Sequence, residues 1–441
     1  MGERETLQHH NLKLSFAPKR EIDRIRAARL DRFARAALLA DVFRLNTLYM
    51  IMRAGSGHIG TSFSAMDIAT WLWTEEMDHP NEKGTNPADI YFSSKGHDVP
   101  GLYAILMGIG KIDFDFIHRL RRLGGLPGHP DIGTPSIATN TGSLGMGISK
   151  AKGMAYAKRR TGRTGRLYVL TGDGELQEGQ IWEALRPAVN GKYGEITVIV
   201  DHNKMQSDTW VRLVNDVGDL EARFRSSGWE VARCDGHNLK AIHEALAILN
   251  AVKDRPHILI ADTVKGKGIS FMESTSFMDD EGYKFHAGAP LSADYARGRD
   301  ELRGRIDARL AQANLPALVL EDAEIPPRLP LQSPEKLVDA YGEELSKLAR
   351  ARKEIVVLDA DLWPDCGIGP FRKEFPDRFM ECGIAEQDMV SAAGGMALQG
   401  LLPVVHSFAC FLAPRANEHI YNNATEKTKI IYTGTLAGLI P

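Results

Sequence analysis

The chain has 441 residues, of which 43% are hydrophobic and 25% charged, a length that exceeds one hydrophobic core and predicts two or three domains. Its formal net charge of -3 indicates neither a nucleic-acid-binding protein nor one attracted to a membrane surface. No apolar run approaches the roughly 20 residues of a membrane span, and the start lacks a signal-peptide core, so we expect a cytoplasmic protein.

The first part of the chain has the pattern of an α/β domain. Residues 1–20 are polar and predict an arm, and apolar residues recur at helical spacing from 21 to 52. Further on, glycine-rich loops alternate with short apolar runs. Three of these runs, rich in branched residues, predict buried parallel strands: "RLYVLTGDG", "EITVIVDHN" and "HILIADTVKG". We therefore expect a doubly wound parallel sheet over residues 21–290.

The sequence pattern changes after this domain. Residues 291–333 combine a charged helical stretch with a proline-rich one, and we interpret them as a linker. Helices and strands alternate again over 334–441, which predicts a second parallel-sheet domain. The sequence stops just after what looks like the third strand of that sheet, and this would leave an open apolar edge. We expect this second domain to be incomplete, or to be completed by another polypeptide.

The motif Gly172-Asp173-Gly174 ends the first predicted strand, and Asn203 ends the next one. One crossover helix separates them, so both side chains should reach the carboxyl edge of the sheet, where ligands bind in open α/β folds. A carboxylate, an amide oxygen and the backbone carbonyl of Met205 would form an all-oxygen set suited to Mg²⁺ or Ca²⁺. The glycines would let the backbone approach a diphosphate. Alone, the motif is more often an ordinary turn; its pairing with Asn203 favours the metal site.

In its wider context this stretch resembles the thiamine-diphosphate signature of the transketolase family. The family's flanking motifs occur in order along nearly the whole chain: "RAGSGHIGTSFSAMDI", "SSKGHDVPGLYA", "GLPGHPDIGTPSIATNTGSLGMGI", "TVKGKGISFME", "FHAGAP" and "ECGIAEQDMVSAAGGMALQGLLPVVHSFACFL". The resemblance implies two thiamine-diphosphate-binding-type domains. The first would bind the diphosphate and the metal, and the second, truncated here, would bind the pyrimidine ring, with active sites between two subunits of a homodimer.

The resemblance also implies roles for individual residues. Glu386 in "GIAEQ" matches the glutamate that bonds the cofactor's ring nitrogen and promotes loss of the C2 proton. Phe408 and Phe411 match the aromatic residues packed on the pyrimidine, and Gly142 and Leu144 match a segment that contacts the cofactor. The matching histidines would line the substrate channel and bond sugar hydroxyls: His58, His97, His129 and His286. Each residue taken alone would have an ordinary structural explanation.

Two departures from the family pattern affect the predicted function. Leu337-Val338 stands where the family's enzymes for phosphorylated sugars carry a Thr-Arg pair. Without that arginine a sugar phosphate loses a charge-assisted contact, so we expect an unphosphorylated or otherwise modified sugar, or phosphate binding by other residues. The family's second domain also continues past "YTGTLAGLIP" and is followed by a third domain, which a separate subunit could supply.

The sequence therefore predicts a thiamine-diphosphate- and Mg²⁺- or Ca²⁺-dependent enzyme that moves a two-carbon ketol unit from a ketose to an aldose. One alternative is a decarboxylating ligase similar to the synthase of deoxyxylulose phosphate. The other is a non-catalytic chain, either a truncated paralogue or a subunit that needs a partner. We expect no nucleic acid or membrane as partners.

Overall fold

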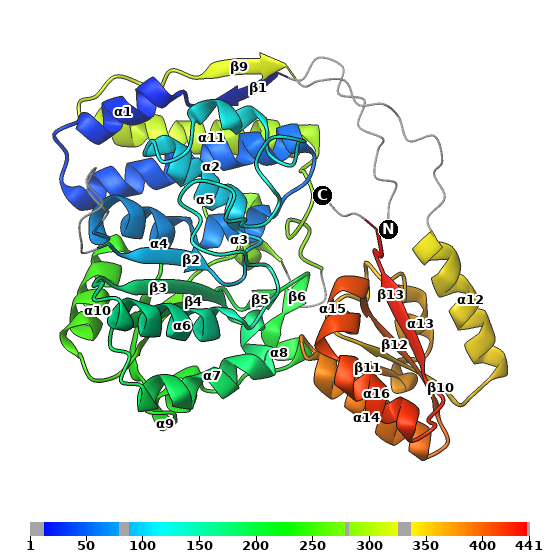
Figure 1. Ribbon diagram of the computed structural model, residues 1–441. Coiled ribbons are helices and arrows are strands. Elements are labelled where there is room, and N and C mark those ends of the chain that lie inside the picture. Colours follow the sequence, from blue (N-terminus) through cyan, green and yellow to red (C-terminus); the bar gives the residue numbers. More distant parts are fainter. Residues whose placement is uncertain (1–12, 79–87, 278–281, 325–336, 439–441) are drawn as a thin grey trace. The chain divides into compact units, whose positions relative to one another are not determined.

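The computed structural model describes residues 13–78, 88–277, 282–324 and 337–438 and divides the chain into two compact units (Figure 1). The first unit comprises residues 1–176, 180–208 and 218–328. The second comprises 177–179, 209–217 and 329–441. Within the described residues no helix is long and apolar enough to cross a membrane.

The core of the first unit is a five-stranded, wholly parallel sheet in the order β2-β3-β4-β8-β7. Its strands are β2 (Ile90–Ser93), β3 (Leu167–Gly172), β4 (Ile196–His202), β7 (Glu230–Asp235) and β8 (His257–Asp262). The predicted strands β3, β4 and β8 are confirmed, and nearly all of their side chains are buried. Burial on both faces is the physical reason that their sequences are continuously apolar.

Helices cover both faces of this sheet. One face packs against α2 (Arg32–Ala54), α4 (Met66–Trp71), α5 (Val99–Gly108) and α10 (Leu239–Ala251), which share one core with the sheet residues Tyr168, Leu170, Ile199 and Leu259. On the other face α6 (Gly147–Arg160) contacts β3 and β4, with α7 (Gly179–Asn190) and α9 (Leu220–Ser226) nearby (Figure 1). The short elements α3 (Ile59–Ser64) and β5 (Met205–Gln206) also belong to the first unit, whereas β6 (Thr209–Trp210) and α8 (Val211–Val214) fall in the second.

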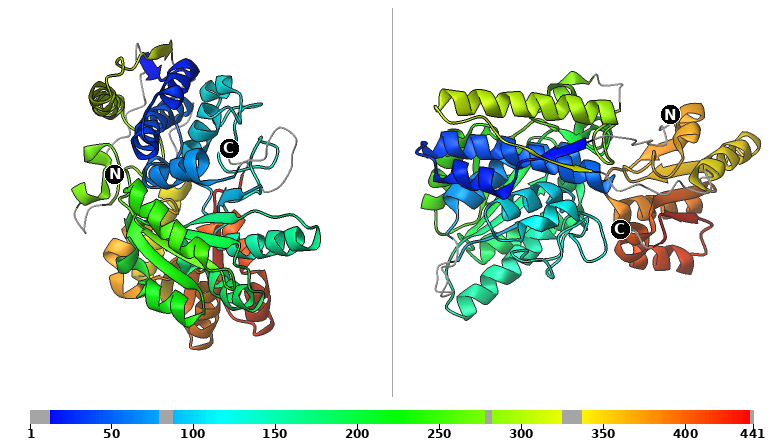
Figure 2. Two further views of the ribbon diagram at one scale, coloured as in Figure 1. Left: turned by 90° about the vertical axis from the view of Figure 1, so that its left-hand side faces the viewer. Right: turned by 90° about the horizontal axis from the view of Figure 1, so that it is seen from above.

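A further layer covers α2 on the side away from the sheet. Strand β1 (Lys13–Phe16) pairs antiparallel with β9 (Glu321–Glu324), although the two lie about 300 residues apart in sequence. Helix α11 (Ser292–Gln312) lies along α2, with α1 (Lys19–Ala27) beside it (Figures 1 and 2). Thus α11 and β9, which fall in the range expected to be a linker, and β1, which falls in the range expected to be an arm, belong to the first compact unit.

The second unit contains a four-stranded parallel sheet in the order β11-β10-β12-β13. Its strands are β10 (Ile355–Asp359), β11 (Phe379–Glu381), β12 (Leu402–Phe408) and β13 (Ile431–Thr435). Its helices are α12 (Leu337–Ala351), α13 (Gly369–Glu374), α14 (Glu386–Leu398), α15 (Ala409–Arg415) and α16 (Asn417–Thr425). Among the described residues β13 is an edge strand, paired with β12 only. The prediction of two α/β domains with parallel sheets is confirmed.

Candidate cofactor and substrate site

Asp173 and Asn203 lie side by side at the carboxyl edge of the first sheet. Strands β3 and β4 are neighbours, with Gly172 opposite Asp201, so the residues that follow them emerge together. The Lys204 backbone N–H donates to Asp173 Oδ2 and the Gly174 N–H to Asp173 Oδ1, at 2.5 and 2.8 Å. The Asn203 Oδ1 accepts from the Met205 N–H at 3.0 Å. The three residues of the expected metal set thus lie in two adjacent loops, which the Lys204–Asp173 hydrogen bond joins.

The chemistry of this set fits a hard divalent cation. The Asp173 side chain is 2% exposed, and burial raises its pKa to about 6. Within the described part of the chain Asp173 forms no ion pair, so a bound cation would stabilise its buried negative charge. Asp173, the Asn203 amide oxygen and the Met205 carbonyl would supply oxygen ligands alone, as Mg²⁺ and Ca²⁺ prefer.

A buried ion pair beneath this edge was not predicted from the sequence. Lys95, in the loop after β2, places its Nζ 2.5 Å from Asp201 Oδ2 and 2.7 Å from the Thr61 hydroxyl. Lys95 and Asp201 are 1% and 0% exposed. Asp201 Oδ2 also accepts from the Ser64 hydroxyl at 2.6 Å, and the amide of Asn203 lies 3.4 Å from the same oxygen. The pair ties the loop before His97 to β4, the strand that Asn203 follows.

Glu175 performs a similar task next to the Gly-Asp-Gly turn. Its carboxylate is 3% exposed. It accepts hydrogen bonds from the Ser94 and Thr171 hydroxyls at 2.5 and 2.6 Å and from the Gly145 and Gly172 N–H groups at 2.9 and 3.1 Å. It therefore joins the turn, the loop after β2 and the "NTGSLGMG" loop into one rigid wall.

The four predicted histidines come together in the first unit. The ring of His58 lies 5.1 Å from that of His97, 5.2 Å from His286 and 6.2 Å from His129, between centroids. Their Cα atoms belong to four separate loops, so only the fold makes them neighbours. Because Lys95 bonds Asp201 and the His97 Nδ1 contacts the Lys95 carbonyl at 2.9 Å, the histidine group adjoins the edge that carries Asp173 and Asn203.

The histidine rings are held in the neutral form. Burial is the main cause in each case: it lowers the pKa of His97 to about 3, those of His58 and His286 well below the ordinary value, and that of His129 to a lesser degree. The positive charges of Lys95 and Arg121 act in the same direction on His97 and His129, respectively. A neutral imidazole offers one donor and one acceptor nitrogen.

Two of these rings have polar atoms without a partner. The Nδ1 atoms of His58 and His286 are buried and form no hydrogen bond with any described residue. Buried polar atoms are nearly always bonded in folded proteins, so these nitrogens indicate a place where a polar ligand would bind.

The glycines expected to approach the cofactor have different surroundings. Gly142 adopts φ +121°, and a Cβ there would lie 2.7 Å from the His129 ring. A Cβ on Gly174 would lie 2.8 Å from the Gln206 Cβ, whereas one at Gly172 would make only ordinary contacts. Glycine is thus required by close approach at 142 and 174. Leu144, beside Gly142, is half-buried.

Glu386 is the first residue of α14 in the second unit and is 2% exposed. Its Oε1 accepts a hydrogen bond from Arg415 Nη1 at 2.7 Å, and the same Nη1 donates to Glu178 Oε1 at 2.6 Å, where Glu178 belongs to this unit. The Glu386 Oε2 is buried and forms no hydrogen bond within the described residues. One carboxyl oxygen is therefore fixed, and the other remains available to a ligand.

Phe408 and Phe411 also lie together in the second unit. Phe408 ends β12 and Phe411 lies in α15, and their rings stack with centroids 5.7 Å apart and an interplanar angle of 26°. The Arg415 guanidinium lies 4.6 Å from the Phe411 ring centre. Half-buried stacked rings next to a carboxyl group suit a flat aromatic ligand.

The two residues at the position of the expected Thr-Arg pair differ in exposure, and Val338 is half-buried. Helix α12 begins at Leu337, whose side chain is 89% exposed. Residues 325–336, just before it, lie outside the described residues.

Comparison with known proteins agrees with this arrangement. Residues 35–299 match the family described as transketolase, thiamine diphosphate binding domain, and residues 335–440 match the transketolase pyrimidine binding domain. The chain is similar to mouse transketolase-like protein 2 (33% identity over 420 residues, 91% of this chain and 65% of the relative) and to human transketolase (32% over 413 residues, 91% and 64%). It thus spans just under two thirds of the length of these relatives.

A third similarity concerns a shorter protein. The 6-deoxy-6-sulfo-D-fructose transketolase subunit SqwG of a Clostridium species is 38% identical over 237 residues, which cover 53% of this chain and 86% of that protein. Among solved structures, transketolase from Leishmania mexicana has a similar fold, with a TM-score of 0.53 and 22% identity over 90% of this chain and 68% of that one. With two thiamine-diphosphate-type domains in the family's order, the chain belongs to the transketolase family.

Proposed function

We propose that this protein takes part in the transfer of a two-carbon ketol unit from a ketose donor to an aldose acceptor, with thiamine diphosphate and a divalent cation as cofactors. The observation that carries the proposal is the convergence of four neutral histidines, two with unbonded buried nitrogens, on the sheet edge formed by Asp173 and Asn203. Such a group can bond several sugar hydroxyls beside a cofactor diphosphate.

Each half of the cofactor has residues suited to it. Asp173, Asn203 and the Met205 carbonyl would hold Mg²⁺ or Ca²⁺ against the diphosphate, with Gly142, Leu144, Gly172 and Gly174 lining the approach. Phe408 and Phe411 would pack on the aminopyrimidine ring, and Glu386 Oε2 would share a proton with its N1′ atom. When bound, thiamine diphosphate supplies a nucleophilic carbon at C2 of its thiazolium ring.

The protein's own groups would orient the sugar and move its protons. A neutral histidine can accept a proton from one hydroxyl while donating its N–H to another oxygen. The ring centroids of His58, His97 and His286 lie 5.1, 5.2 and 5.8 Å apart in pairs, so these rings could bond neighbouring oxygens of a ketose. Their lowered pKa values keep these rings uncharged at neutral pH, so each has an acceptor nitrogen for a sugar hydroxyl.

We further propose that the sugar lacks the usual terminal phosphate. The Thr-Arg pair is replaced by Leu337-Val338, and SqwG, by its name, serves a sulfonated sugar. A sulfonate or a hydroxyl needs fewer cationic contacts than a dianionic phosphate. A screen of fructose, 6-sulfofructose and fructose 6-phosphate as donors should rank the phosphate ester last; a clear preference for it would refute this point.

We also propose a homodimer in which the two domains of different chains complete each active site, with a separate chain able to supply the part of the family's fold beyond this sequence. The name of SqwG identifies it as a subunit, which supports such an arrangement.

Calorimetric titration tests the cofactor proposal. The protein, alone and with its candidate partner chain, should bind thiamine diphosphate only when Mg²⁺ or Ca²⁺ is present, and Asp173→Ala should abolish binding. Asp216→Ala, which removes another acidic side chain outside the metal set, is the control. Failure to bind under any of these conditions would favour a non-catalytic chain, and release of CO₂ from pyruvate with added glyceraldehyde phosphate would favour the decarboxylating reaction.

A further inference from the structure

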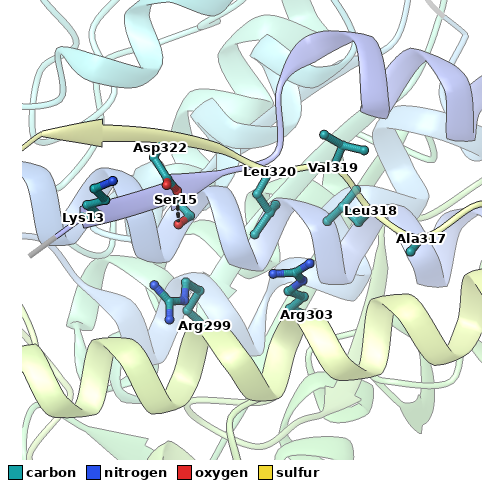
Figure 3. Close-up of a pocket in the computed structure, with 9 residues that line it drawn as sticks. All are labelled: Lys13, Ser15, Arg299, Arg303, Ala317, Leu318, Val319, Leu320 and Asp322. Atoms are coloured by element: carbon teal, nitrogen blue, oxygen red, sulfur yellow. Dashed lines mark hydrogen bonds between the residues drawn. The ribbon is translucent and has the colours of Figure 1, made fainter.

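A basic cavity lies in the first unit between α11 and the strand pair β1–β9 (Figure 3). Its volume is about 690 Å³, within the range of about 300–1,000 Å³ that small-molecule sites occupy. The residues on its wall come from three segments remote in sequence: β1, α11 and the stretch 317–322.

Three cationic side chains line this cavity. Arg299 and Arg303 lie one turn apart on the same face of α11, and Lys13 lies on β1 (Figure 3). Lys13 has no ion pair or side-chain hydrogen bond within the described residues. Arg303 approaches the Asp307 carboxylate at 3.5 Å, and Arg299 pairs with Asp300, which is 65% exposed. Exposed ion pairs of this kind contribute little to stability, so the two arginines remain available to another anion.

The only acidic residue among the cavity's lining residues is already bonded. Asp322 Oδ1 accepts a hydrogen bond from the Ser15 hydroxyl at 2.7 Å. The other acid near Arg303, Asp307, accepts a bond from the Leu318 N–H at 2.8 Å through Oδ1. Among the lining residues three are cationic and one is acidic; Asp300 and Asp307, which approach the two arginines, lie outside the lining, so the wall itself offers mainly cationic groups to an anion.

Part of the wall is apolar. Ala317, Leu318, Val319 and Leu320 line it, and the Val319 side chain is 53% exposed although it is purely hydrocarbon. A ligand with both a charged end and a flat or apolar body would cover this surface and meet the cations together.

The cavity is separate from the proposed active site. Its elements lie on the side of α2 away from the sheet, whereas Asp173 and Asn203 lie at the sheet's carboxyl edge (Figure 1). None of the residues to which we assign a role in cofactor or sugar binding lines it.

We propose that this cavity binds a nucleoside di- or triphosphate, with the phosphates against Lys13, Arg299 and Arg303 and the base against the wall of residues 317–320. The three cationic side chains could each bond a phosphate group, and the exposed Val319 side chain could pack against the flat ring of a base. This would be a second binding site, separate from the proposed thiamine diphosphate site.

Equilibrium dialysis with labelled ATP tests the proposal. The full chain, in about 0.15 M salt, is first saturated with thiamine diphosphate and Mg²⁺ so that a diphosphate site of the cofactor type is filled. We expect saturable binding of one ATP per chain, weakened at least tenfold by Arg299→Gln combined with Arg303→Gln. Arg297→Gln is the matched control: Arg297 lies on the same helix over the Phe271 ring and does not line the cavity.

The outcomes are distinguishable. Absence of saturable ATP binding would overturn the proposal, and so would equal weakening by Arg297→Gln, which would indicate diffuse charge attraction. Tripolyphosphate should compete more weakly than ATP; equal affinity would overturn the nucleoside part. If the double variant fails to fold, Lys13→Gln, at an exposed strand position, should still weaken binding several-fold, and ATP should slow hydrogen exchange in residues 317–320. Because the readout is binding, the result does not depend on whether the proposed sugar chemistry is correct.

Discussion

At the scale of single residues, the second unit holds its key carboxyl group by one oxygen only. Arg415 fixes Glu386 Oε1, while Oε2 is buried without a partner among the described residues. A buried acceptor left unbonded costs about 1–3 kcal/mol, a cost that a ligand donor would remove. Glu386 therefore has one fixed oxygen and one unbonded oxygen, which is the geometry that the proposed bond to a ring nitrogen requires.

Glu386→Gln should abolish exchange of the cofactor's C2 proton for deuterium while leaving diphosphate affinity nearly unchanged. The amide keeps the size of the side chain but cannot share a proton with N1′. Exchange is followed by NMR after acid quench, and affinity by calorimetry. Asp388→Asn, an exposed acid in the same first turn of α14, is the control. Exchange at the wild-type rate in E386Q would refute the role assigned to Glu386.

A second pair of acids in this unit makes its stability depend on pH. Asp359 ends β10 and is fully buried; burial, reinforced by the charge of Glu381, raises its pKa well above the ordinary value. Burial likewise raises the pKa of Glu381. A carboxyl group whose pKa is raised on folding binds more protons in the folded state, so stability is greatest below the unfolded pKa and falls as the pH rises through the folded pKa.

Asp359→Asn should therefore stabilise the protein at pH 8, by roughly 1–3 kcal/mol, and progressively less as the pH is lowered. The asparagine oxygen can still accept the Leu362 N–H, which Asp359 now accepts at 2.7 Å. Urea unfolding at pH 5 and pH 8 measures the difference, with exposed Asp377→Asn as the control. The same change in unfolding free energy at both values would contradict the explanation.

At the scale of elements, the strands with a clear hydrophobic pattern could be predicted from the sequence. Contacts between residues far apart in the chain could not. Strands β3, β4 and β8 are continuous branched runs because both faces are buried, and they were predicted. Strand β7, at the sheet's edge, has only one buried residue, and β11 has three residues, so neither carries a strong signal. Asp173 and Asn203 could be placed together because strand ends meet at one edge. The partners Lys95 and Asp201 lie 106 residues apart, and only the charged residue inside the apolar run "ITVIVDHN" hints at that pair.

The Lys95–Asp201 pair should hold the loop after β2 onto β4. Lys95→Met leaves Asp201 buried without its cation and should destabilise the protein by about 3–5 kcal/mol. Adding Asp201→Asn removes the unpaired charge, so the double variant should be more stable than the single one. Denaturant unfolding of the two single variants and the double variant gives the coupling energy. Strict additivity would show that the pair does not act as a unit.

At the scale of the whole molecule, the residues proposed for catalysis divide between the two compact units. The metal set and the histidines belong to the first, and Glu386 with the stacked phenylalanines belongs to the second. A chain that carries both halves can complete a site within itself or with another copy. If two copies of the chain complete each other's sites in a symmetric dimer, each active site combines the first unit of one chain with the second unit of the other.

Complementation separates these cases. Asp173→Ala should inactivate only the metal-binding half of the site, in the first unit. Glu386→Gln should inactivate only the half in the second unit. When the two variants are mixed equally and allowed to exchange subunits, half of the dimers are mixed. If sites are shared between chains, each mixed dimer contains one site without either substitution, so about one quarter of all sites should regain C2 proton exchange. If each chain builds its own site, no mixture regains activity. Exchange of the cofactor proton needs no sugar, so the test applies whichever substrate the protein uses and locates the active site relative to the subunit boundary.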